Sequence, residues 1–283
     1  MLGPIGDAAR GRLADAAAAR LAGDGYAVSR PETSVEPPAV ATHPDGERTL
    51  AVEPLTADDA TATVIASRLA HALDRDRSVC FAVDDGATAE TVRTLLSEPA
   101  LLAAEREGRR TFHAGPDRIP VAGGGYACIR FEGAGTPTFV WRETDTPVGP
   151  VPSGPGVDAA SVAEDGRPTV PRLVCEVDGR VVAVLAGVES LRDPPAEAFP
   201  YAYSRHADDK RFRVRRGADG EVVESASGFA PMRAAGYVPV PMPLVPEHVL
   251  GPSYAPDRRA GVGSGVALAD AWCVRRFAAA DDA

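Results

Sequence analysis

One stretch of the sequence, from Ser78 to Pro99, constrains the fold more than any other. It opens with an apolar run, Val79 to Val83, whose length fits a strand buried on both faces. Asp84-Asp85-Gly86 then turns the chain, because glycine accepts a positive φ and aspartate bonds neighbouring backbone groups. Apolar residues follow at helical spacing, with Thr88 or Asp85 as the helix cap. The stretch predicts a strand-turn-helix unit, the building block of α/β proteins.

The sequence on either side extends this unit to an α/β domain over residues 1–145, with a mixed sheet and flanking helices. An alanine-rich helix is expected from Asp7 to Gly23, a hairpin around Pro44-Asp-Gly46 and a second helix from Thr56 to Asp74. The helix of the central stretch is expected to run on, or to restart, past Pro99 as far as Glu107. This alternation of helices and strands is typical of a layered α/β fold.

The sequence changes character after residue 145. Residues 146–167 are rich in proline and glycine and show little periodicity, which predicts a linker. Residues 168–283 then predict a β-rich (α+β) domain. It begins with a hairpin around a two-residue type I′ turn at Asp178-Gly179, and a second hairpin turns at residues 217–220. Val266 to Phe277 is expected to form a closing helix.

The charged residues bound the possible partners. Acidic residues number 40 and basic residues 30, for a net charge of -10, and Lys210 is the single lysine. This composition resembles that of halophilic archaeal proteins, whose acidic, lysine-poor surfaces stay hydrated in concentrated salt, although a high-GC soil bacterium would show the same excess of arginine. An acidic balance argues against attraction of the whole surface to nucleic acid or anionic membranes.

Cysteine usage and hydropathy point to a cytoplasmic protein. No apolar run approaches the roughly 20 residues that span a bilayer, and the N-terminus lacks the pattern of a signal peptide. Cys80, Cys128, Cys175 and Cys273 each lie in an apolar run, far from one another in sequence, and are expected to be buried, reduced thiols. No Cys or His spacing suits zinc, so we expect neither a metal site nor a cofactor.

The candidate binding residues are arginines and tyrosines of the second half. On a strand, Arg211, Arg213 and Arg215 share one face, and beside Tyr201 and Tyr203 they would hold phosphates or stack bases. The alternative interpretation is a charge-paired hairpin. Such a hairpin would place Arg213 opposite Glu224 and Arg216 opposite Glu221, with its apolar side chains on the inner face.

Asp84 and Asp85 are candidate catalytic residues. They follow a buried strand at the carboxyl end of the sheet, where open α/β sheets place their ligands, and aspartates there can hold Mg²⁺. His113 is the residue expected to join them if the site is real. The alternative interpretation is an acidic turn that caps the following helix.

Glu53 follows a predicted strand, and the order helix, hairpin, helix, strand in the first half is similar to the restriction-endonuclease-like fold. The acid-x-lysine motif of that family is absent, because Glu53 is followed by Pro54 and Leu55. The resemblance covers at most half of the chain and implies a fold whose nuclease site has been lost.

These observations favour a cytoplasmic, non-enzymatic binding or scaffold protein, whose partner is another protein or a second copy of the chain. Nucleic acid is a less favoured partner, and a membrane is not expected. The alternative is a metal-dependent enzyme acting on a phosphate-bearing or nucleic-acid substrate through the Asp84-Asp85 turn.

Overall fold

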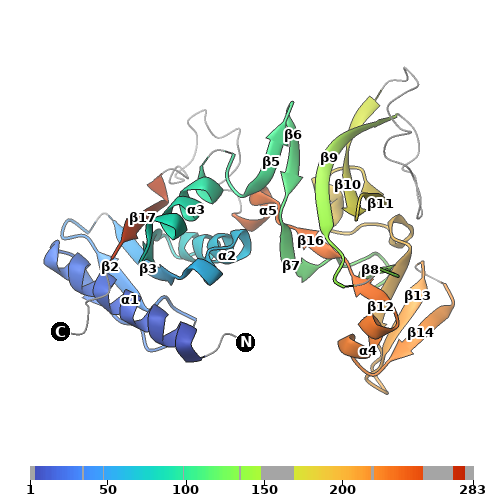
Figure 1. Ribbon diagram of the computed structural model, residues 1–283, viewed down its shortest axis with the longest axis horizontal. Helices are drawn as coiled ribbons and strands as arrows, with labels where there is room; N and C mark the ends of the chain where they lie inside the picture. The colour runs from blue at the N-terminus through green and yellow to red at the C-terminus, as the bar shows by residue number, and fades with distance from the viewer. Residues whose placement is uncertain are drawn as a thin grey trace. The chain divides into compact units, whose positions relative to one another are not determined.

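The computed structural model describes residues 4–33, 35–46, 48–97, 99–133, 135–147, 169–217, 220–250 and 270–277 (Figure 1). The chain divides into two compact units. Unit 1 combines residues 1–101 with residues 245–283, and unit 2 comprises residues 102–244. The first half is α/β with a mixed sheet and flanking helices, and the second half is β-rich, as the sequence predicts. Within the described residues, no helix is long and apolar enough to cross a membrane.

Unit 1 is built on a mixed sheet whose described strands lie in the order β1-β2-β3-β4-β17. The strands are β1 (Ala27–Ser29), β2 (Ala39–Thr42), β3 (Thr49–Leu55), β4 (Ser78–Val83) and β17 (Trp272–Arg276). The first three are antiparallel neighbours, whereas β4 runs parallel to β3 and β17 runs parallel to β4. Every residue from Val79 to Val83 is fully buried, which confirms a central strand covered on both faces.

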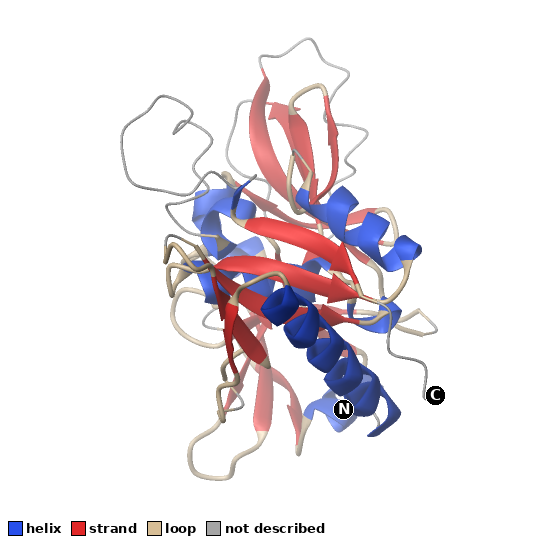
Figure 2. Cartoon of the chain, turned by 90° about the vertical axis from the view of Figure 1, so that its left-hand side faces the viewer, coloured by secondary structure: helices blue, strands red, loops and turns tan. Residues whose placement is uncertain are grey.

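Helices cover both faces of this sheet. On one face lies α1 (Pro4–Gly23), whose Leu13, Ala17 and Leu21 pack against small and branched residues of β2, β3 and β4 (Figure 2). On the opposite face lie α2 (Ala62–Leu73) and α3 (Gly86–Leu96), which contact β4. The short elements η1 (Ala57–Asp59) and α5 (Pro246–Val249) complete the described part of unit 1. Because alternate strand residues face opposite layers, β4 contributes Cys80 and Ala82 to the α1 side.

The C-terminal strand is the main correction in this unit. The sequence predicts a helix over residues 266–277, but residues 272–276 form β17, paired with residues 79–83. Residues 266–269 lie outside the described residues. The physical reason is that β4 is buried, so the backbone groups along its outer side need partners, and β17 supplies them. Trp272, Cys273 and Val274 are also compatible with an extended strand.

Unit 2 consists mainly of antiparallel strands. Its described sheets have the orders β11-β10-β9-β6-β5, β14-β13-β12-β8-β15 and β16-β7. The strands are β5 (Leu102–Arg106), β6 (Arg109–Phe112), β7 (Ala114–Arg118), β8 (Tyr126–Arg130), β9 (Phe139–Pro147), β10 (Thr169–Val177), β11 (Arg180–Leu185), β12 (Tyr201–Arg205), β13 (Phe212–Arg216), β14 (Val222–Ala226), β15 (Tyr237–Pro239) and β16 (Pro241–Pro243). The short helical elements are η3 (Val188–Leu191), η4 (Ala196–Ala198) and α4 (Phe229–Ala234). The helix expected to reach Glu107 is replaced by β5, which pairs with β6.

The expected domain boundary at residues 146–167 does not separate the two units. Strands β9 and β10, on either side of it, pair along their whole length from Phe139↔Val177 to Pro147↔Thr169 and belong to one sheet. The proline- and glycine-rich segment therefore joins two paired strands of unit 2, and the domains 1–145 and 168–283 are replaced by the division given above. Composition alone does not distinguish a linker from a long connection between paired strands.

Candidate functional site

Asp85 caps α3. Its Oδ1 accepts a hydrogen bond from the Thr88 backbone N–H at 2.8 Å, and its Oδ2 accepts one from the Thr88 hydroxyl at 2.5 Å. These bonds from Thr88 hold the pKa of the Asp85 carboxyl below its ordinary value of 3.8. Both oxygens that would bind a cation are thus engaged by the first turn of the helix, which is the arrangement of an N-cap.

The other candidate catalytic residues do not extend this turn into a visible cluster. Asp84 is exposed at the end of β4. His113 lies between β6 and β7 and belongs to unit 2, where burial lowers the pKa of its imidazole. Among the described residues, no three His, Cys, Asp or Glu side chains gather in a group that could hold a metal ion.

The candidate arginines and tyrosines of unit 2 lie on opposite faces of one sheet. Tyr203 lies opposite Val214, whereas Arg213 lies opposite Ser204 on the neighbouring strand. Since residues directly opposite share a face and neighbours along a strand alternate, Tyr201 and Tyr203 face away from the side of Arg213 and Arg215. The structure therefore does not bring the arginines and the tyrosines together.

Two of the candidate arginines have partners within their own hairpin or the loop before it. Arg213 forms an ion pair with Asp209 at 3.0 Å, while Arg211 donates to the Ser225 hydroxyl at 3.0 Å and to the Ser225 carbonyl at 2.7 Å. The partner expected for Arg213 differs, because a register shift between Val214 and Arg215 places Ser225 opposite Arg213. Arg216 keeps its expected neighbour, since its N–H donates to the Glu221 carbonyl at 3.3 Å. The Nε of Arg215 is buried and has no hydrogen-bond partner among the described residues.

The tyrosine face is an aromatic core covered by α4. Tyr203 is 2% exposed and contacts Phe212 and Phe229, whose ring centroids lie 4.4 Å apart. The Arg118 guanidinium stacks on Phe229 at 4.0 Å from the ring centroid, a cation–π contact. Burial raises the pKa of the Tyr203 phenol to about 12, and the charge of Arg118 opposes that rise. Tyr203 therefore packs the core and is not available to stack a base.

Unit 1 contains an ion pair with a buried carboxylate at the position singled out by the fold resemblance. Glu53 in the middle of β3 is 3% exposed, and Arg68 of α2 donates to its carboxylate. Burial raises the pKa of Glu53 above its ordinary value of 4.5, whereas Arg68 and, more weakly, His71 lower it. Leu55, at the position where the nuclease motif would carry lysine, is fully buried. Glu53 is therefore paired with Arg68 of α2, and its own strand has no lysine at the motif position.

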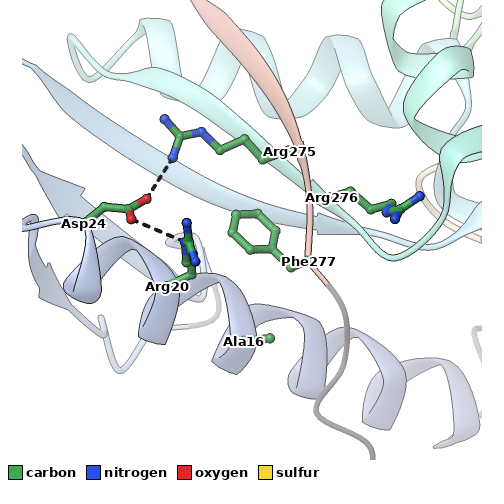
Figure 3. A pocket seen from close by; sticks show the side chains of 6 residues that line it. All are labelled: Ala16, Arg20, Asp24, Arg275, Arg276 and Phe277. Atoms are coloured by element: carbon green, nitrogen blue, oxygen red, sulfur yellow. Dashed lines mark hydrogen bonds and ion pairs between the residues drawn. The ribbon is translucent and has the colours of Figure 1, made fainter.

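A pocket of about 500 Å³ opens where the end of α1 meets β17. Figure 3 shows its lining residues, which are Ala16, Arg20, Asp24, Arg275, Arg276 and Phe277. Sequence reasoning missed this site because its two sides are separated by some 250 residues of chain and no local motif marks either side.

The charges of this pocket are predominantly positive. Asp24 lies between two arginines, with its Oδ1 at 3.3 Å from the Nε of Arg20 and its Oδ2 at 3.4 Å from an Nη of Arg275. Arg276 extends away from Asp24 (Figure 3) and is exposed. Phe277 packs against the α1 core and is only 7% exposed. The lining thus holds three guanidinium groups and one carboxylate, and two of the three contact that carboxylate, in a chain whose net charge is -10.

Comparison with known proteins found no matching family model, no similar curated protein and no similar solved structure.

Proposed function

We propose that the protein is a cytoplasmic, non-enzymatic binding protein that holds an acidic segment of a partner protein in the α1–β17 pocket. The excess of guanidinium groups over carboxylates in that pocket carries the proposal. A partner carboxylate gains charge-assisted hydrogen bonds from Arg275 or Arg276, and Arg20 is already held close by through Asp24. In concentrated salt the attraction between distant charges is screened, so the binding depends on direct contacts within the pocket.

The metal-dependent enzyme has less support. Both carboxylate oxygens of Asp85 serve the helix cap, which leaves Asp84 as the one carboxylate of the turn without a capping bond.

The likeness of unit 1 to the restriction-endonuclease-like fold is also a proposal. It is supported by the order helix, antiparallel strands, helix, parallel strand, and the replacement of the lysine position by Leu55 favours a scaffold without nuclease chemistry. The salt-adapted origin remains a proposal from composition.

The experiment compares Arg276→Glu with Arg12→Glu, two exposed arginines of unit 1 that undergo the same charge change. Each protein is titrated against a fluorescent peptide of alternating aspartate and glycine, and against the matching asparagine peptide. We expect the wild type and Arg12→Glu to bind the aspartate peptide, Arg276→Glu to bind it at least ten-fold more weakly, and none to bind the asparagine peptide.

The same three proteins are then used as bait in native lysate at the salt concentration of the cell. A stoichiometric protein captured by the wild type and Arg12→Glu, but lost with Arg276→Glu, supports the proposal. Equal capture by all three would exclude the pocket as the site. Recovery of nucleic acid that Arg211→Glu abolishes would move the interface to unit 2. A solitary protein, together with no peptide binding, would contradict a binding function.

A further inference from the structure

Two cysteines that are far apart in sequence lie side by side in unit 1. Cys273 of β17 is directly in register with Cys80 of β4, its parallel neighbour. Residues in register on adjacent strands point to the same face, and both cysteines pack against the core on the α1 side. Adjacent strands are about 4.8 Å apart, which falls inside the Cα separation of about 4.4–6.8 Å that a disulfide needs.

The two thiols have different surroundings. Cys80 is fully buried, whereas Cys273 is half-buried. The hydrogen bond from Cys80 and the positive charges of Arg275 and Arg48 lower the pKa of Cys273 to about 7. The same contact and burial raise the pKa of Cys80. Arginines beside a partly accessible thiol are the environment that makes a cysteine nucleophilic.

The remaining cysteines provide an internal contrast. Cys128 and Cys175 are buried in unit 2, where burial raises the pKa of Cys128 to about 12 and that of Cys175 well above its ordinary value. Such thiols pack as small apolar groups and are chemically inert.

We propose that Cys273 and Cys80 form a redox-active dithiol that is oxidised by a hydroperoxide to an intramolecular disulfide between β17 and β4. The Cys273 thiolate attacks one oxygen of the hydroperoxide and the O–O bond breaks. With hydrogen peroxide, Cys273 becomes a sulfenic acid and hydroxide leaves, which takes a proton from solvent to give one water. The Cys80 sulfur then attacks the Cys273 sulfur. The S–O bond breaks, and hydroxide leaves with the Cys80 proton as a second water. The two thiols lose two electrons in total, and the hydroperoxide is reduced.

The structural consequence concerns β17, which lies at the edge of the described sheet and pairs there with β4. A disulfide within that pairing joins the two strands covalently. It also closes a loop of nearly two hundred residues, which restricts the unfolded chain strongly. The oxidised protein is therefore expected to resist separation of β17 from β4. This expectation does not depend on which ligand the α1–β17 pocket binds.

The test treats the intact, reduced protein with one equivalent of hydrogen peroxide, followed by alkylation under denaturing conditions and peptide mapping. We expect a Cys80–Cys273 disulfide, with Cys128 and Cys175 recovered as alkylated thiols. Thiol reductants should reverse the change, and the disulfide form should melt at a higher temperature. Recovery of all four cysteines as thiols, or a disulfide between any other pair, would overturn the proposal.

Variants separate the roles of the two thiols. In Cys80→Ala the sulfenic acid cannot be resolved, so dimedone should label Cys273, whereas Cys273→Ala should show no labelling at all. Cys128→Ala is the matched control and should form the disulfide like the wild type. Labelling of Cys80 in Cys273→Ala, or none of Cys273 in Cys80→Ala, would contradict the assignment. The wild-type peptide map decides the question even if a variant folds poorly.

Discussion

Both carboxylate oxygens of Asp85 accept hydrogen bonds from the first turn of α3. Removing this carboxylate should therefore lower the free energy of unfolding. Asp85→Ala removes the N-cap and should lower the free energy of unfolding by about 1 kcal/mol. Asp84→Ala, which removes an exposed neighbour without a capping bond, should change it by less than about 0.5 kcal/mol. Urea unfolding of the three proteins measures both values.

The same three proteins decide between a cap and a metal site. If Asp85 acts only as a cap, Mg²⁺ and Mn²⁺ should leave the melting temperature of the wild type unchanged. A rise in melting temperature with Mn²⁺ that disappears in Asp84→Ala would revive the metal-dependent enzyme.

The Glu53–Arg68 pair predicts a pH-dependent stability. Burial raises the pKa of Glu53 in the folded protein, so folding favours the protonated carboxyl. The resulting contribution to the free energy of unfolding is fully present below pH 4.5, the ordinary pKa, and is lost as the pH rises through the pKa of the folded protein. Arg68 opposes that loss by stabilising the charged form. Arg68→Gln should therefore cost little in acid and on the order of 3 kcal/mol near neutral pH, where Glu53 would be a buried, unpaired charge.

Denaturant unfolding of the wild type and Arg68→Gln across this pH range measures the difference. Arg93→Gln is a matched control, because Arg93 pairs with Glu90 on an exposed surface and should show no pH-dependent loss. A constant difference between wild type and Arg68→Gln at all pH values would mean that the charge of Glu53 is not what Arg68 stabilises.

Strand β17 makes a prediction about hydrogen-bond direction. The Phe277 N–H donates to the Val83 carbonyl at 2.8 Å, so by alternation the N–H of Arg275 points to β4 and that of Arg276 points away. Arg275→Pro should thus leave a buried carbonyl of β4 unpaired and cost about 1–3 kcal/mol more than Arg275→Ala. Arg276→Pro should differ much less from Arg276→Ala.

Thermal and urea unfolding of these four variants tests the assignment of residues 272–276 as a strand. Equal losses in the two proline variants would contradict the observed pairing, and the helix predicted from the sequence would then be the better description of this segment.

The division of the whole molecule is testable with fragments. Residues 102–244 form one compact unit and should unfold in a single cooperative transition when expressed alone. A fragment of residues 1–145 separates β9 from β10 and lacks β17, so it should expose unpaired strand edges and aggregate. Circular dichroism melting and gel filtration distinguish the outcomes. Cooperative folding of 1–145, with failure of 102–244, would restore the boundary at the proline- and glycine-rich segment.

Local patterns by themselves determined several parts of this protein. The buried strand β4, the turn after it, the start of α3 and the type I′ turn at Asp178-Gly179 all follow from neighbouring residues, and both turn residues have the positive φ that this turn requires. The α/β and β-rich halves follow as well, because periodicity reports which faces of an element are buried. Asp85 was among the candidate caps for the same reason.

Tertiary structure decided what depends on distant partners. Residues 272–276 form a strand because the edge of β4 needs hydrogen-bond partners. Their pairing with β4 places Cys273 beside Cys80 and brings Arg275, Arg276 and Phe277 to the α1–β17 pocket. The register of β12 against β13 placed the arginines on the face opposite Tyr201 and Tyr203, and the bulge between β13 and β14 moved Arg213 from Glu224 to Ser225. Each of these features needs hydrogen bonds or packing between segments that a local window does not contain, and a one-residue shift in register moves every side chain to the other face.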